Sequence, residues 1–260
     1  MLRFAFVPLC LLVLLFSAAV SVASVSHISD FVGSDLRYRV GFLWLDHVAD
    51  GAFSLIRGNE PNVFQARLVG KTRGVTAWLT NDRVQTYETR MRLLPDGRLQ
   101  TLYHESSIDK GSGKKKKNRR KTYRFDPVNR QVLIEKVGDG KVMWSKSIAV
   151  EGDIFPVDIL TAFFNFVTGV YGPVETGRHY DIVAFSGEGV GTIRIDVLPP
   201  NKAPESFLAG GGLLCRAQVD QEIFDTRDGV IYFKLDSVRR PSRGLIVDII
   251  GLGDIRGIMR

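Results

Sequence analysis

The most concentrated chemical feature of the chain is a run of positive charge near its middle. Seven of the eight residues from 114 to 121 are basic, and Asn118 is the interruption. The basic residues are Lys114, Lys115, Lys116, Lys117, Arg119, Arg120 and Lys121, and together they are called the basic run below. Such a run attracts nucleic-acid phosphates or anionic membrane headgroups, or it keeps a hairpin tip hydrated.

Other residue types give little sign of catalysis or metal binding. The histidines, at positions 27, 47, 104 and 179, do not pair at the spacing of a zinc-binding helix. Cys215 lies in a strand-like stretch, which predicts a buried and unreactive thiol. Asp220, Glu222 and Asp225 could meet in space, but nothing in their spacing requires it. We predict no metal, no cofactor and no catalytic residue.

The chain begins with the features of a secretory signal peptide. Arg3 precedes an apolar run, and Ser21-Val22-Ala23 fits the small-x-small pattern of a cleavage site. The apolar run is shorter than the roughly 20 residues that a membrane-spanning helix needs. We predict a signal peptide at residues 1–23 and export to the periplasm, with a retained N-terminal anchor as the alternative.

The distribution of charge argues against nucleic acid as the partner. Removal of residues 1–23 takes away Arg3 and lowers the formal net charge from +7 to +6, and without the basic run it would be −1. Proteins that bind nucleic acid usually spread cations over a face and interleave aromatic residues, but this run has none before Tyr123. We predict no nucleic-acid partner. A hydrated loop and a loop that touches an anionic membrane surface remain open.

Most of the sequence alternates apolar and polar residues with a period of two, which indicates half-buried strands. In residues 36–45 the alternation places Leu36, Tyr38, Val40, Phe42 and Trp44 on one face. Residues 84–94, 191–198 and 215–224 repeat the pattern, and short turns separate such stretches. Strands joined by short turns run antiparallel. We predict a mainly β fold with a strongly curved or barrel-like antiparallel sheet of about 10–12 strands.

The domain organisation is simple. No shift in composition divides the chain, so residues 24–260 are expected to form a single antiparallel β domain. The basic run follows a linker-like Gly-Ser-Gly stretch, and blocks of like charge repel one another. We therefore expect a flexible basic hairpin loop at residues 109–121.

One stretch breaks the alternation and predicts a short helix at residues 156–168. Pro156 and Asp158 suit the first turn of a helix, and Gly169 suits its end. Phe163 and Phe164 lie on neighbouring apolar stripes of this helix. Either the helix packs on the sheet as part of the core, or it covers an apolar cavity in which both rings would contact a ligand.

Three segments, near both ends and in the middle of the chain, each contain a different short motif. Residues 31–55 include an opening strand and contain Gly33, Leu36, Tyr38, Val40 and Gly51. Residues 155–169 contain a helical segment of the type Asp-x-Leu-Thr-Ala-Phe-Phe. Residues 229–259 contain an Asp and an Arg-Arg-Pro. Together they resemble a bacterial envelope family that is catalogued as domain of unknown function 3108. The resemblance implies an exported, mostly β domain. It carries over no activity, because the family has none assigned.

In the last of these segments the counterparts of the family motif are Asp236, Arg239 and Arg240. An arginine guanidinium can hold the carboxylate or phosphate of a ligand in a two-pronged grip. Alternatively, these residues form an ion pair that pins the last turn of the sheet.

Three classes of function remain open. The first is a non-catalytic module that holds a lipid or another apolar molecule, by analogy with barrel-like lipid carriers. The second is an envelope interaction or assembly protein whose basic run touches an anionic membrane surface. The third is an enzyme of unrecognised type. The sequence predicts no oligomeric state.

Overall fold

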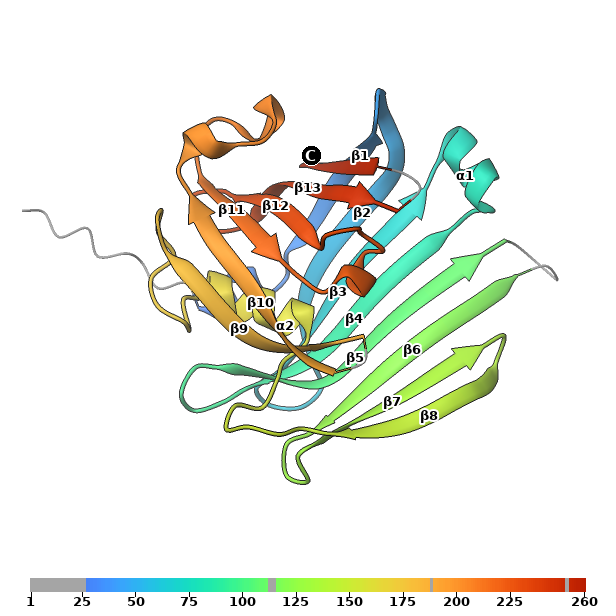
Figure 1. Cartoon of the computed structure of the whole chain (residues 1–260), viewed down its shortest axis with the longest axis vertical. Helices are drawn as coiled ribbons and strands as arrows, with labels where there is room; N and C mark the ends of the chain where they lie inside the picture. The colour runs from blue at the N-terminus through green and yellow to red at the C-terminus, as the bar shows by residue number, and fades with distance from the viewer. Residues whose placement is uncertain (1–26, 112–115, 188, 251–252) are drawn as a thin grey trace, which may run out of the picture.

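The structure is a computed structural model that describes residues 27–111, 116–187, 189–250 and 253–260. The predicted signal peptide lies outside the described residues, and so do Lys114 and Lys115. Within the described residues the chain forms one 14-stranded antiparallel sheet and two α-helices (Figure 1). None of the described helices is both long enough and apolar enough to cross a membrane.

The strands form a meander in which almost every strand pairs with its neighbours in sequence. The first seven are β1 (Asp35–Phe42), β2 (Leu45–Arg57), β3 (Val63–Thr72), β4 (Val84–Leu93), β5 (Leu99–Lys110), β6 (Lys117–Asp126) and β7 (Gln131–Gly138). The other seven are β8 (Lys141–Ala149), β9 (His179–Ser186), β10 (Gly189–Leu198), β11 (Leu213–Gln218), β12 (Val230–Leu235), β13 (Pro241–Ile249) and β14 (Gly253–Met259). In the sheet β1 pairs with β14, and β8 and β9 are the two edges.

The predicted fold class is confirmed, although the sheet has more strands than expected. Edge strand β8 explains part of the difference, because nearly all its side chains are exposed and no buried face imposes alternation on its sequence. Elsewhere the alternation predicted the buried face correctly: Tyr87, Thr89 and Met91 of β4 are buried. The sheet bends around a helix (Figure 1), and no ladder of the described strands joins β8 to β9. It is therefore curved and open.

The enclosed helix, α2 (Ile159–Val167), begins later than predicted. Val157 forms a parallel bridge with Ala184, so the chain is still extended there. Asp158 is the N-cap, and its carboxylate accepts hydrogen bonds from the amides of Leu160 and Thr161. Pro156 thus precedes the helix and is not in its first turn. The predicted end is confirmed, since Gly169 has a φ of +79° beyond the last turn.

The basic stretch is not a loop from 109 to 121. Strand β5 extends to Lys110 and β6 starts at Lys117, with Asp109 opposite Asn118 and Ser106 opposite Lys121 in the antiparallel ladder. Backbone hydrogen bonds and cross-strand carboxylates offset the repulsion between the cations, so the strands persist into the charged segment. The connection between the strands is limited to residues 111–116.

Candidate functional site

The described part of the basic run lies mostly exposed at one end of β6. Lys116, Lys117, Arg119 and Arg120 are exposed, whereas Lys121 is half-buried. Two carboxylates of β5 neutralise some of this charge: Arg120 Nε lies 3.2 Å from Glu105 Oε1, and Lys116 Nζ lies 3.6 Å from Asp109 Oδ1. These pairs are open to solvent, so they hold the side chains only weakly.

Lys121 differs from the other cations because it lies farther along β6, beside the buried part of the strand. Its Nζ donates to the carbonyl of Gly187 at 3.0 Å and lies 5.4 Å from the ring centre of Tyr123. Tyr123 itself packs against Phe185 in a buried cluster. Lys121 therefore ties β6 to the β9–β10 turn, and it is a structural residue.

The ends of several hairpins meet beside the basic run. In an antiparallel meander every second connection lies at the same end of the sheet, which here groups the connections after β1, β3, β5 and β7. The amide of Gly111 donates to the carbonyl of Asn81 in the β3–β4 connection. The amide of Asn118 donates to Asp139 Oδ1 in the β7–β8 turn at 2.9 Å. Figure 1 shows these ends following one another along one side of the molecule.

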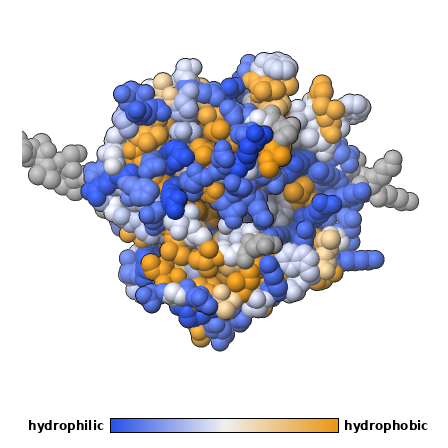
Figure 2. All heavy atoms as spheres, in the orientation of Figure 1, coloured by the Kyte–Doolittle hydropathy of each residue, from blue (hydrophilic) through white to orange (hydrophobic). Residues whose placement is uncertain are grey.

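Exposed tryptophans lie at this same end. Trp44 in the β1–β2 turn is 81% exposed, and Trp78 in the β3–β4 connection is 80% exposed. We call the β1–β2 turn, α1 (Gly74–Thr80) and the described basic run the basic–aromatic end of the sheet. Figure 2 shows hydrophobic side chains projecting over the β1–β2 turn and α1, with hydrophilic side chains farther along the same side.

Two of these features differ from the sequence-based expectations. The sequence alternation predicts Trp44 on the apolar face of a strand, but β1 ends at Phe42 and the chain turns, which leaves the indole in solvent. Helix α1 was not predicted. A sequence signal existed, because Val75, Trp78 and Leu79 recur at helical spacing. The segment spans only two turns, too short for periodicity to separate it from a loop.

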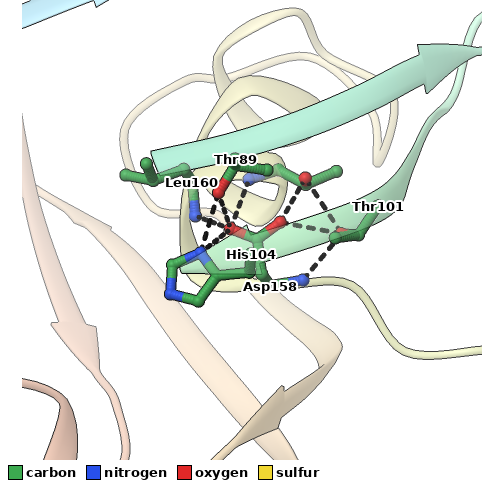
Figure 3. A network of polar contacts seen from close by, with 6 residues as sticks. Thr89, Thr101, His104, Asp158 and Leu160 are labelled. Carbon is green, nitrogen blue, oxygen red and sulfur yellow. Dashed lines mark hydrogen bonds and ion pairs between the residues drawn. The ribbon is translucent and has the colours of Figure 1, made fainter. Parts of the chain in front are cut away.

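A second concentration of polar groups is buried between α2 and strands β4 and β5 (Figure 3). The carboxylate of Asp158 accepts hydrogen bonds from the hydroxyls of Thr89 at 2.7 Å, Thr101 at 2.8 Å and Thr161 at 2.5 Å. His104 Nδ1 lies 3.2 Å from Asp158 Oδ1 and 2.8 Å from Thr89 Oγ1. Burial alone would raise the pKa of Asp158. The hydrogen bond and the electrostatic attraction from His104, together with the hydrogen bonds from the threonine hydroxyls, outweigh burial and lower the pKa to about 2.

This network has a structural role. A nucleophile–base–acid relay uses the two nitrogens of a histidine ring for different partners, whereas Thr89 and Asp158 both face Nδ1 of His104. Asp158 and Thr89 are fully buried, so a substrate has no access to them. The network instead caps α2 and fixes it to β4 and β5. Asn165 adds to this by exchanging two hydrogen bonds with the backbone of Leu99.

Of the two predicted ligand contacts on the helix, Phe164 is buried in the core and Phe163 packs against the core. The rings of Phe163 and Phe164 lie 5.6 and 5.5 Å from the ring of Phe53, and Phe163 also contacts Phe233. Phe166 is fully buried against Tyr180. Aromatic side chains thus occupy the space between α2 and the sheet.

The predicted polar contacts near the C-terminus form a turn. Asp236 and Arg240 make the ion pair that the structural interpretation expects, with 2.9 Å between Arg240 Nη2 and Asp236 Oδ2, across the β12–β13 turn and not the last one. Arg239 has a φ of +63°, and its guanidinium donates to the carbonyl of Val167 at the end of α2. The carboxylate of Asp236 and the guanidinium of Arg240 thus bind each other, and the guanidinium of Arg239 binds the backbone.

A surface pocket of about 280 Å³ lies elsewhere, beside the segment that leads into β11. Its cations are Lys234 and Arg243, and the Lys234 ammonium donates to the carbonyls of Leu208, Ala209 and Gly210. All three ammonium protons are thereby used, so the pocket offers little charge to an anion. No group of three or more His, Cys, Asp or Glu side chains with metal-binding geometry occurs among the described residues.

The comparisons with known proteins give no relative. No family model matches the chain, and neither a curated protein nor a solved structure matches it. The resemblance to domain of unknown function 3108 therefore stays a prediction from short motifs, and the basic–aromatic end of the sheet is the candidate site on its geometry alone.

Proposed function

We propose that this chain is a non-catalytic, exported envelope protein that attaches peripherally to an anionic membrane surface through the basic–aromatic end of its sheet. The observation that carries the proposal is the exposure of Lys116, Lys117, Arg119 and Arg120 at one end of β6. Each cation near an anionic bilayer contributes about 1 kcal/mol, so a group of this size supports reversible attachment.

A lipid held beneath the helix is less well supported. That function needs an apolar cavity between α2 and the sheet, and the rings of Phe53, Phe163, Phe164 and Phe233 occupy this space. A peripheral attachment needs no internal cavity. It also accounts for cations that are exposed at the end of a strand instead of being paired in full with carboxylates.

Vesicle flotation tests the proposal. The protein, expressed from its full sequence and purified, is mixed with vesicles of phosphatidylcholine alone or with added phosphatidylglycerol. We expect binding to the anionic vesicles only, and weaker binding as salt shortens the screening length from ~10 Å at 0.1 M. In the test variant Lys117, Arg119 and Arg120 are replaced by Gln.

A matched variant controls for the loss of three charges. Arg92 at the end of β4 away from α1, and Arg98 and Arg178 in connections, lie outside the basic–aromatic end and are replaced by Gln in the same way. We expect the test variant to bind anionic vesicles about tenfold or more weakly, and the control variant to bind as the unchanged protein does. Equal binding by both variants, or equal binding to neutral vesicles, would contradict the proposal.

A further inference from the structure

Helix α1 has the polarity of its faces reversed. A short amphipathic helix on a soluble protein normally turns its apolar stripe toward the core. In α1 the stripe made of Val75, Trp78 and Leu79 points to solvent, with exposed fractions of 73%, 80% and 69%. The opposite side contacts the sheet through polar atoms, since the hydroxyl of Thr80 donates to that of Thr72. None of the helix residues is buried.

The β1–β2 turn presents the same composition. Leu43, Trp44 and Leu45 are all exposed, and Leu43 adopts a φ of +51°, a conformation in which a turn usually has Gly or Asn. A bulky apolar residue at such a position costs stability and gains no burial in the free protein. The turn is nevertheless held in place, because Arg256 Nη1 donates to the carbonyl of Leu43 at 2.8 Å.

Hydrogen bonds fix the two apolar tips relative to each other and to the cations. The amide of Arg73, just before α1, donates to the carbonyl of Val48 in β2 at 2.8 Å. The carboxylate of Asp50 in β2 pairs with Arg73 and with Arg260 of the last strand's end. On its other side, α1 is followed by Asn81, whose carbonyl accepts from Gly111 next to the basic run.

We propose that the β1–β2 turn and α1 insert into the interfacial layer of an anionic lipid bilayer, with Trp44 and Trp78 at headgroup depth and the described part of the basic run over the headgroups beside them. Tryptophan prefers this layer because its ring is largely apolar and its N–H remains hydrogen-bonded. Apolar tips next to Lys and Arg are the composition of surface-bound membrane segments, whereas the cores of protein interfaces are depleted of Lys. The inference rests on the proposed function and adds to it a part of the attachment that does not depend on charge.

Three variants that each retain a single tryptophan test the insertion. The chain has three tryptophans, so Trp44, Trp78 or Trp144 is kept and the other two are replaced by Phe. Trp144 lies on edge strand β8, several strands away from both apolar tips, and is the comparison residue. With phosphatidylglycerol vesicles we expect a blue shift and quenching by lipids brominated on their acyl chains for Trp44 and Trp78, and neither effect for Trp144.

Binding at high salt separates the insertion from the charge effect. At about 0.5 M salt the screening length falls to ~4 Å, so apolar contacts should supply most of the remaining affinity. We expect Trp44→Ser and Trp78→Ser each to lower this affinity about tenfold, because partial burial of a large aromatic side chain contributes roughly 1.5 kcal/mol. Both residues are exposed, so circular dichroism should show an unchanged fold.

The outcomes distinguish the inference from the function on which it rests. Salt-sensitive binding without quenching of Trp44 or Trp78 would overturn the insertion and leave the membrane attachment standing. No binding to any vesicle would remove both. A blue shift caused by self-association or by a protein ligand, with no effect of lipid, would assign the tips to a protein interface and also overturn the insertion.

Discussion

Replacement of Asp158 by alanine removes the buried carboxylate that joins α2 to the sheet. The carboxylate accepts from three threonine hydroxyls and two backbone amides and lies beside His104. Loss of an N-cap costs about 1 kcal/mol, and each buried hydrogen-bonding group that is left without its partner costs about 1–3 kcal/mol. Because these contributions share the same atoms, we expect a total loss of about 4 kcal/mol.

Urea denaturation followed by circular dichroism measures this loss as a change in the free energy of unfolding. Asp158→Asn is the intermediate case: asparagine also caps helices but lacks the charge, so we expect a loss of about 1–3 kcal/mol. Asp96→Ala is the control, since Asp96 accepts from Arg98 in an exposed turn and should contribute little to stability. A loss for Asp158→Ala no larger than that for Asp96→Ala would refute the structural role of the network.

The same network predicts a sign for the dependence of stability on pH. The pKa of Asp158 falls from 3.8 to about 2 on folding, so the ionised carboxylate stabilises the folded state above pH 3.8. This contribution, about 2 kcal/mol, is lost as the pH falls from 3.8 through 2. The difference in unfolding free energy between the unchanged protein and Asp158→Asn should therefore shrink over this range. A difference that grows with acid would contradict the assignment.

Three further predictions test the packing. Gly229→Ala should lower the free energy of unfolding by more than about 3 kcal/mol, because the added Cβ would overlap the carbonyl of Val219. Gly140→Ala, with a similar positive φ and open space, should lower it by about 1 kcal/mol. Equal losses in urea denaturation would refute this. Burial raises the pKa of the Cys215 thiol, so mass spectrometry should find it unalkylated in the folded protein and alkylated in urea; rapid native labelling would count against it. Phe164→Ala should cost about 3–5 kcal/mol, and a loss below 1 kcal/mol would show that the ring is not core.

The two groups of polar residues differ in how far they could be predicted from the sequence. The turn containing Asp236 and Arg240 was foreseeable as a possible ion pair, because the two residues are four apart in one short segment. The Asp158 network was not, because Thr89, Thr101 and His104 come from β4 and β5, far from α2 in sequence. No local spacing connects these residues to Asp158. The β4–β5 hairpin pairs Thr89 with His104, but only the packing of α2 against the curved sheet brings Asp158 to them.

The amino-acid sequence by itself determined the mainly β fold, the antiparallel pairing, the inward face of strands such as β4 and the end of α2 at Gly169. These features depend on periodicity and turn residues, which act over a few positions. Tertiary structure alone decided that Trp44 and the apolar stripe of α1 face solvent and lie at the same end of the sheet as the basic run. Whether an apolar side chain is buried depends on what covers it, and at this end of the sheet the described residues provide no cover.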